Sequence, residues 1–197
     1  SEAGIKSEKM RTGELEVDEW TRLAQAGDLL SKTELYFDET SDITVQQMKA
    51  KLRRMKKVDL VVIDYLGLMH SARQTDNRVQ EVSEITRSLK IMAKELKVPV
   101  IACAQLSRAT EQKGKSHKPA LADLRDSGSI EQDADIVLFL YRDTYYDAER
   151  ADDEDMSDPG KAECIVAKNR HGEVGTIQLH WDGQFTRFTS VDVFRND

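Results

Sequence analysis

The aliphatic run at residues 58–65 constrains the fold of this chain more than any other feature. Apart from Asp59, residues Val58 to Ile63 are all apolar, and the run ends abruptly at Asp64. This pattern is typical of a buried parallel strand that brings its last side chain to the carboxyl edge of a sheet, where α/β proteins bind ligands. A carboxylate there can hold Mg²⁺ beside phosphate groups. A core strand followed by a capped turn explains the run about equally well.

Glycine-rich phosphate-binding loops are absent from the 197 residues. Neither G-x-x-x-x-G-K-[ST] nor G-x-G-x-x-G occurs. Gly114, Lys115 and Ser116 resemble only the tail of such a loop, because no earlier glycine stands at the required spacing. A chain with the magnesium aspartate but no P-loop is therefore either a fragment or a protein of another kind.

The composition is that of a soluble globular protein, with 39% hydrophobic and 33% charged residues. No apolar run approaches the roughly 20 residues of a membrane span. The first segment is charged from Glu2 onward, so we expect no secretory signal. Cys103 and Cys164 lie within apolar runs, which favours buried free thiols over a disulfide. We expect one cytoplasmic domain over residues 1–197, with no membrane association.

The net charge of −7 does not exclude a nucleic-acid partner. Residues 147–161 alone carry a balance of −5, which leaves only −2 for the rest of the chain. A single acidic loop can point outward while another face stays basic, and binding depends on where the charges lie.

Hydrophobic periodicity predicts an α/β fold with a mostly parallel sheet that is extended by antiparallel strands near the carboxyl terminus. Thr44 and Gln47 form a capping-box pattern before a helix, and Ser129 with Gln132 can cap a shorter one. The expected helices are 18–30, 44–55, 79–96 and one near 129–132. The expected strands are 35–37, 58–64, 98–104, 136–141, 164–167, 176–181 and 185–188.

Polar residues follow the second core strand and precede the third. Gln105 ends a strand expected beside Asp64, where it can hydrogen-bond a terminal phosphate or its attacking water; a simple capping residue is the alternative. Residues 124–135 combine small and polar side chains with a helix start. Free amides there, with Arg125 adding charge, suit an anion such as a nucleic-acid backbone, although an ordinary capped turn has the same residues.

Two cations, Lys168 and Arg170, stand at a hairpin-like bend. Side chains at i and i+2 of a strand end point to the same side. Held toward a neighbouring subunit, they can stabilise a transferring phosphoryl group, as arginine fingers do. An exposed basic turn is the alternative.

Together these segments resemble the DnaB-type replicative DNA helicases, in their carboxyl-terminal RecA-like motor domain. The resemblance covers nearly the whole chain in order, and the string from Ser127 to Asp135 is highly specific. The matching stretches are 10–13, 18–20, 60–68, 77–96, 98–108, 124–142 and 167–175.

The resemblance implies a RecA-like P-loop NTPase core that uses ATP and Mg²⁺. Asp64 matches the aspartate that holds Mg²⁺, through water. Gln105 matches the glutamine that couples nucleotide state to DNA contact, and Lys168 and Arg170 match the pair that reaches the neighbouring subunit's ATP. Three residues fall in the loop that grips the single strand: Arg125, Asp126 and Gly128.

The family works as a ring hexamer that moves on single-stranded DNA and unwinds duplex DNA at the replication fork, with primase and a helicase loader as partners. The family's P-loop segment is missing here, so we expect this chain alone to be inactive. We also expect the apolar faces of 60–63 and 100–104 to lose cover and promote self-association. The alternatives are a non-hydrolytic oligomerisation and single-strand-binding module, or another RecA-type ATPase.

Overall fold

A computed structural model describes residues 2–72, 77–106, 118–142 and 160–191, except for the side chains of 125–128. By internal contacts the chain divides into two compact units. Unit 1 comprises residues 1–38, 140–165 and 176–197, and unit 2 comprises residues 39–139 and 166–175. The acidic segment 147–158 and Gly114–Ser116 lie outside the described residues.

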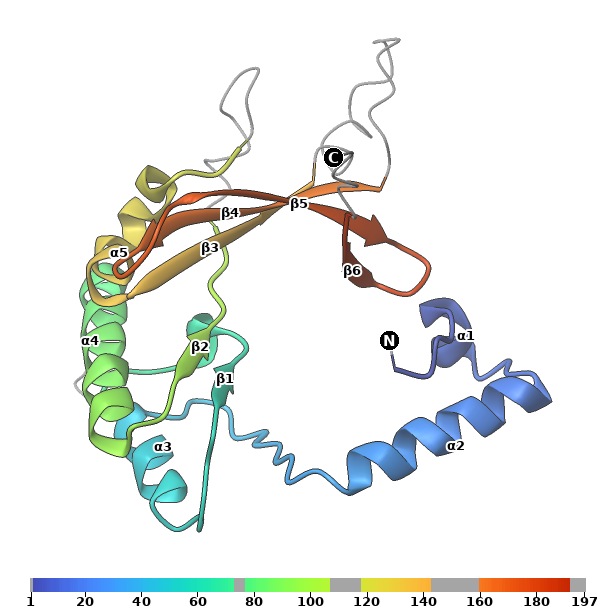
Figure 1. Cartoon of the computed structure of the whole chain (residues 1–197). Coiled ribbons are helices and arrows are strands. Elements are labelled where there is room, and N and C mark those ends of the chain that lie inside the picture. The colour runs from blue at the N-terminus through green and yellow to red at the C-terminus, as the bar shows by residue number, and fades with distance from the viewer. Residues whose placement is uncertain (1, 73–76, 107–117, 143–159, 192–197) are drawn as a thin grey trace, which may run out of the picture. The chain divides into compact units, whose positions relative to one another are not determined.

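Unit 2 is built around a pair of parallel strands and one long helix (Figure 1). Strands β1 (Val61–Ile63) and β2 (Val100–Ala102) pair with Ile63 opposite Ala102. The helices of this unit are α3 (Val45–Leu52), the 3-10 turn η1 (Leu66–Leu68), α4 (Arg78–Leu96), η3 (Leu121–Ser127) and α5 (Gly128–Asp133).

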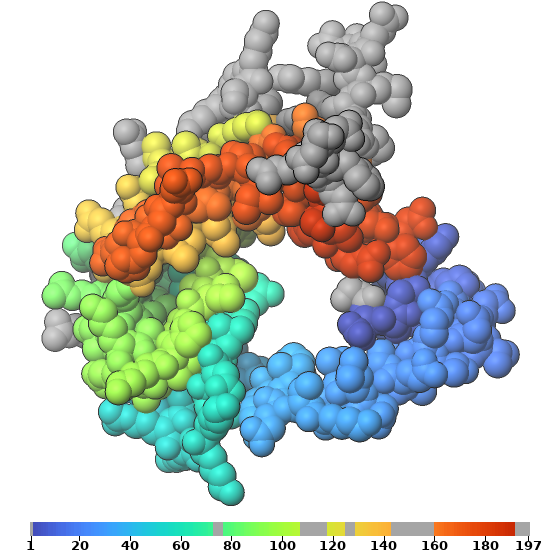
Figure 2. Space-filling view, viewed as in Figure 1, coloured from blue at the N-terminus to red at the C-terminus, as the bar shows by residue number. Residues whose placement is uncertain are grey.

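The 19-residue helix α4 supplies much of the core. Its apolar side chains recur at three- and four-residue spacing, so one face is buried from Val82 to Met92. That face packs on α3, β1 and η1, and the atoms of α3 and α4 (cyan and green in Figure 2) form a contiguous body. The buried cluster contains Val45, Ile63, Leu66, Met69, Ile85, Leu89 and Met92.

Side-chain caps start α3 and α4, and the cap of α3 is the capping box that the sequence predicts. The Thr44 hydroxyl accepts a hydrogen bond from the Gln47 amide, and the Gln47 side chain accepts one from the Thr44 amide. Asn77 accepts hydrogen bonds from the amides of Val79 and Gln80 at the start of α4. Each cap satisfies backbone N–H groups that have no partner within the helix.

A second sheet has the strand order β3–β4–β5–β6. Its strands are β3 (Ile136–Tyr141), β4 (Lys161–Asn169), β5 (Gly175–Asp182) and β6 (Arg187–Ser190), and β5 and β6 are antiparallel. The α/β class is confirmed, but the parallel and antiparallel parts form two sheets rather than one continuous sheet. Among the described strands, β3 hydrogen-bonds to β4 and not to β2, so β2 keeps an open edge.

In unit 1, two helices accompany the carboxyl-terminal strands: α1 (Ser7–Thr12) and α2 (Val17–Ser31). The Ser7 amide donates to the Gln184 carbonyl at 2.8 Å, which ties α1 to the turn between β5 and β6. The Trp181 ring lies 4.6 Å from the Phe188 ring, and the Arg142 guanidinium lies 4.5 Å from Trp181. Trp181 is thus a packing residue.

Three local predictions are wrong. Both cysteines are free, but Cys103 is exposed and Cys164 is only partly buried, so neither is the buried thiol expected from its apolar run. Residues Leu35–Phe37 are exposed and form no strand, because an extended segment is stable only where another strand pairs with it. Ser129 lies inside α5, which already begins at Gly128, and its hydroxyl has no hydrogen-bond partner among the described residues. It therefore does not cap the helix.

The strands of the parallel pair are less buried than their sequences suggest. Val62 is 59% exposed and Ile101 is 53% exposed, whereas Ile63 is buried. One face of β1 and β2 packs on the core, and the other is exposed to solvent. This agrees with the expected loss of cover over 60–63 and 100–104. Self-association of the chain through this face stays a prediction.

Candidate functional site

Asp64 directly follows β1, and its side chain is exposed. Backbone hydrogen bonds connect the segments that follow β1 and β2. The Cys103 amide donates to the Ile63 carbonyl, and the Leu66 amide donates to the Cys103 carbonyl, both at 2.9 Å. Within the described residues, no group of three or more His, Cys, Asp or Glu side chains could enclose a metal. A single accessible carboxylate fits Mg²⁺, which keeps several water molecules in its coordination shell.

Gln105 lies three residues beyond β2, and its side chain is exposed. It lines a cavity of about 200 Å³ together with residues from η1, α4, η3 and α5. The predicted glutamine therefore shares a cavity with the segment that follows Asp64 and with the candidate DNA segment. The lining residues are Tyr65, Leu66, Gly67, Arg78, Val82, Ala104, Gln105, Asp123, Leu124 and Ile130.

The candidate DNA residues Arg125, Asp126 and Gly128 lie where η3 passes into α5. Their side chains are outside the described set, so their contacts stay a prediction. The segment around them is anchored: Leu124 is buried, and the Asp123 carboxylate accepts a hydrogen bond from the Ala120 amide at 2.8 Å.

Lys168 and Arg170 both contact the carboxyl end of α5. The Lys168 ammonium donates to the carbonyls of Glu131, Gln132 and Ala134, and the Arg170 Nη2 donates to the Gln132 carbonyl at 3.3 Å. The prediction that these cations point to the same side is confirmed. Their action on a neighbouring subunit's nucleotide stays a prediction.

Polar side chains of α4 also bind α5 and the residues just after it. The Thr86 hydroxyl donates to the Asp133 carboxylate at 2.7 Å, and the Lys90 ammonium pairs with the Asp135 carboxylate. The Arg170 Nε also lies 3.7 Å from Asp135. Sequence reasoning missed Thr86, Lys90 and Asp135. The four-residue spacing of Thr86 and Lys90 on one helix face was the available signal.

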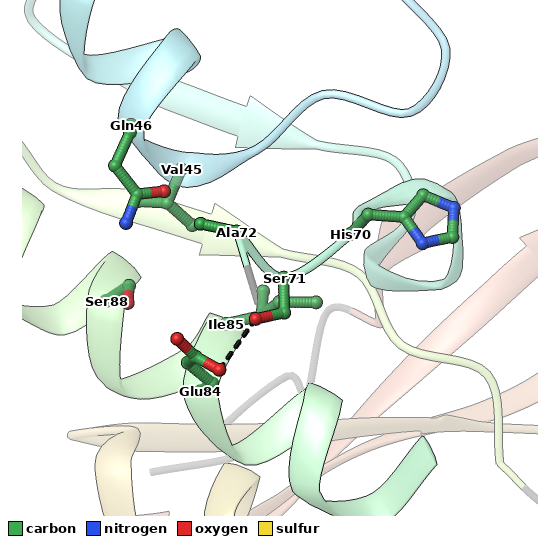
Figure 3. Close-up of a pocket in the computed structure, with 8 residues that line it drawn as sticks. All are labelled: Val45, Gln46, His70, Ser71, Ala72, Glu84, Ile85 and Ser88. Carbon is green, nitrogen blue, oxygen red and sulfur yellow. Dashed lines mark hydrogen bonds between the residues drawn. The ribbon is translucent and has the colours of Figure 1, made fainter. Parts of the chain in front are cut away.

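A cluster of charged and polar side chains joins the segment after η1 to α4. The Glu81 carboxylate lies 2.6 Å from Arg78, 3.0 Å from the His70 ring and 3.3 Å from the Ser71 amide. The Ser71 hydroxyl donates to Glu84 at 2.6 Å, the dashed contact in Figure 3, where the His70 ring points away from the other labelled side chains. These contacts fix the segment that leaves the Asp64 turn.

The Glu81 carboxylate should make stability depend on pH. The hydrogen bond from Arg78 is the main reason that its pKa is lowered; burial opposes the shift, and Ser71 and His70 add to it. A lowered folded-state pKa contributes stability above the ordinary glutamate pKa, and this stability is lost as pH falls through the folded-state value. Glu81→Gln should therefore lower the melting temperature at pH 7 but not in acid. An equal loss at both pH values in thermal denaturation would contradict this assignment.

The family of the chain follows from comparison with known proteins. The model of the DnaB-like helicase C terminal domain matches residues 1–190. The chain belongs to this family. It is 45% identical over 196 residues to the replicative DNA helicase DnaB of Geobacillus stearothermophilus, and 45% identical over 196 residues to the replicative DNA helicase DnaC of Bacillus subtilis (strain 168). Each alignment covers 98% of this chain and 42% of the relative.

Solved structures show the same fold. One of them, an ATPase domain, superposes with a TM-score of 0.86 at 35% identity, covering 97% of this chain and 67% of that one. A DnaB-like replicative helicase, studied for its interactions with primase, gives a TM-score of 0.86 at 35% identity, with 97% and 47% covered. The RecA-like core predicted from sequence is thereby confirmed. The chain spans less than half the length of the curated relatives it matches.

In the described part of the chain, no helix is both long enough and apolar enough to cross a bilayer.

Proposed function

We propose that this chain forms part of the motor domain of a hexameric replicative DNA helicase, with residues 1–197 as one portion of that domain. The complete protein couples ATP hydrolysis to movement along single-stranded DNA and to unwinding of duplex DNA. The observation that carries the proposal is the match to replicative helicases over 98% of the chain. The fold adds support, because it places Asp64 at the carboxyl end of a parallel strand.

Each candidate residue has a distinct role in this proposal. Asp64 holds Mg²⁺ through water beside the phosphates of ATP, and Gln105 relates the state of the nucleotide to the DNA segment. Lys168 and Arg170 belong to the turn that faces the neighbouring subunit's nucleotide. Arg125, Asp126 and Gly128 contact the DNA backbone. Primase and a helicase loader are the proposed partners of the complete assembly.

The direct test is ATP-dependent unwinding of a forked duplex by the complete protein. We expect strand separation that requires both ATP and Mg²⁺. DNA binding and ring formation without any ATP hydrolysis would instead support a non-hydrolytic oligomerisation and single-strand-binding module.

The DNA assignment predicts a defined salt effect for Arg125→Ala. Because binding to a phosphate carries no sequence information, single-stranded DNA binding should weaken by a similar factor on every sequence. The dependence of log affinity on log salt concentration should become shallower by about 0.7 for each phosphate that the variant no longer neutralises. Titrations at several salt concentrations measure both quantities.

Arg54→Ala is the matched control for that titration, since Arg54 is an exposed arginine just beyond α3. It should leave the affinity and the salt slope close to those of the unaltered protein. If Arg125→Ala behaves like Arg54→Ala, the segment from η3 to α5 is only a structural turn.

A further inference from the structure

The carboxyl end of α5 binds two cations that sequence and family assign to one role, but it binds them differently. The last carbonyls of a helix have no partner within the helix and carry its negative dipole end, so cations are stabilised there. Lys168 and Arg170 both occupy this end, together with Asp135, which follows α5 by two residues. The difference between the two side chains lies in how many of their donors are engaged.

All donors of the Lys168 ammonium are engaged within its own chain. An ammonium has three N–H groups, and that of Lys168 donates to the three carbonyls of Glu131, Gln132 and Ala134. These contacts hold the carboxyl end of β4 against the carboxyl end of α5.

Arg170 makes its side-chain contacts through Nε and Nη2, along one side of the guanidinium. Its backbone amide donates to the Asp135 carbonyl at 2.8 Å, its Nε lies 3.7 Å from the Asp135 carboxylate, and its Nη2 donates to Gln132. Among the described residues, its Nη1 has no hydrogen-bond partner, and the side chain is 48% exposed. A guanidinium fixed along one side can present its remaining donors to an anion.

Asp135 is itself held in place from the core. Its carboxylate pairs with Lys90, which projects from the helix that supplies the core cluster. The hydrogen bond from Lys90 is the main reason that the pKa of Asp135 is lowered; burial opposes the shift, and the charges of Lys90, Arg170 and His171 add to it. The carboxylate is therefore ionised at neutral pH and links α4 to the turn that carries Arg170.

We propose that Asp135 is a positioning residue that fixes Arg170 for its action on the neighbouring subunit's nucleotide. This inference rests on the proposed function. In this arrangement Arg170 touches the phosphoryl group, and Asp135 determines where Arg170 stands. It also connects the turn physically to the helix that follows the candidate DNA segment.

The test is a double-mutant comparison of ATP hydrolysis in the complete protein. Asp135→Asn should lower kcat by about 10- to 100-fold, because displacing a reacting group by about 1 Å has effects of this size. KM should change little, because the interaction that is removed belongs to the transition state. In an Arg170→Ala background, Asp135→Asn should cause no further loss, and Asp135→Glu in the otherwise unaltered protein should restore part of kcat.

Thr86→Val is the matched control, because it removes the neighbouring tie between α4 and α5 without touching Arg170. It should lower the melting temperature but keep kcat well above that of Asp135→Asn. If Asp135→Asn slows hydrolysis by the same factor with and without Arg170, Asp135 does not act through Arg170, and the inference is wrong while the proposed function stands. If Arg170→Ala alone hydrolyses ATP at the unaltered rate, the proposed role of Arg170 fails and the positioning role falls with it.

Discussion

In the complete protein, Arg170→Ala is expected to slow ATP hydrolysis by about 10³- to 10⁵-fold, the range over which arginine fingers act. The reason is that positive charge aimed at the transferring phosphoryl group stabilises the transition state more than the ground state. Asp64→Ala should also abolish turnover, because it removes the carboxylate that we propose as the Mg²⁺ ligand. Steady-state hydrolysis and unwinding of a forked duplex measure both effects.

The two variants should complement each other when their subunits are mixed. In the proposed mechanism Asp64 acts within its own subunit and Arg170 acts on its neighbour. Some interfaces of a mixed ring would then combine one intact magnesium site with one intact arginine. Mixed rings should therefore hydrolyse ATP faster than rings of either variant alone. Rings without any such gain would show that the two residues do not serve different subunits.

Within the fold, Ile85→Ala is expected to lower the free energy of unfolding by about 2–5 kcal/mol. Ile85 is 2% exposed and lies at the centre of the cluster formed by α3, β1, η1 and α4. Its truncation removes buried apolar packing and leaves a cavity that a close-packed core fills only in part. Urea denaturation followed by circular dichroism measures the change.

Ile91→Ala on the same helix is the matched control, because Ile91 is 49% exposed. Its loss should be at most about 1 kcal/mol, since much of the side chain is already in contact with water. Equal losses for the two variants would mean that the face of α4 assigned to the core is wrong.

The elements that could be predicted from sequence are those whose residues determine their own conformation. The apolar stripe of α4 repeats over the 19 residues of the helix, and the pairing of Thr44 with Gln47 satisfies amides within a single turn. The abrupt end of the apolar run at Asp64 correctly marked the carboxyl end of a parallel strand. None of these features needs information from distant parts of the chain.

What could not be predicted depends on distant partners. Residues Leu35–Phe37 have strand-forming side chains, but a strand also requires a neighbour, and sequence pattern does not supply one. The ion pair of Lys90 with Asp135 joins residues 45 positions apart, and neither position departs from ordinary surface composition. The hydrogen bonds from Lys168 to carbonyls at the end of α5 also join distant positions, so the sequence did not predict them.

The dependence of α5 on Lys168 and Arg170 has a consequence for the order of events during synthesis. A helix of six residues is far too short to persist by itself in water. The cations that stabilise its carboxyl end follow it by 34 to 38 residues along the chain. While the ribosome is still making β4, α5 has its contacts with α4 but lacks the cations at its carboxyl end. The helix that follows the candidate DNA segment therefore gains its last contacts only after the turn that carries Arg170 has emerged.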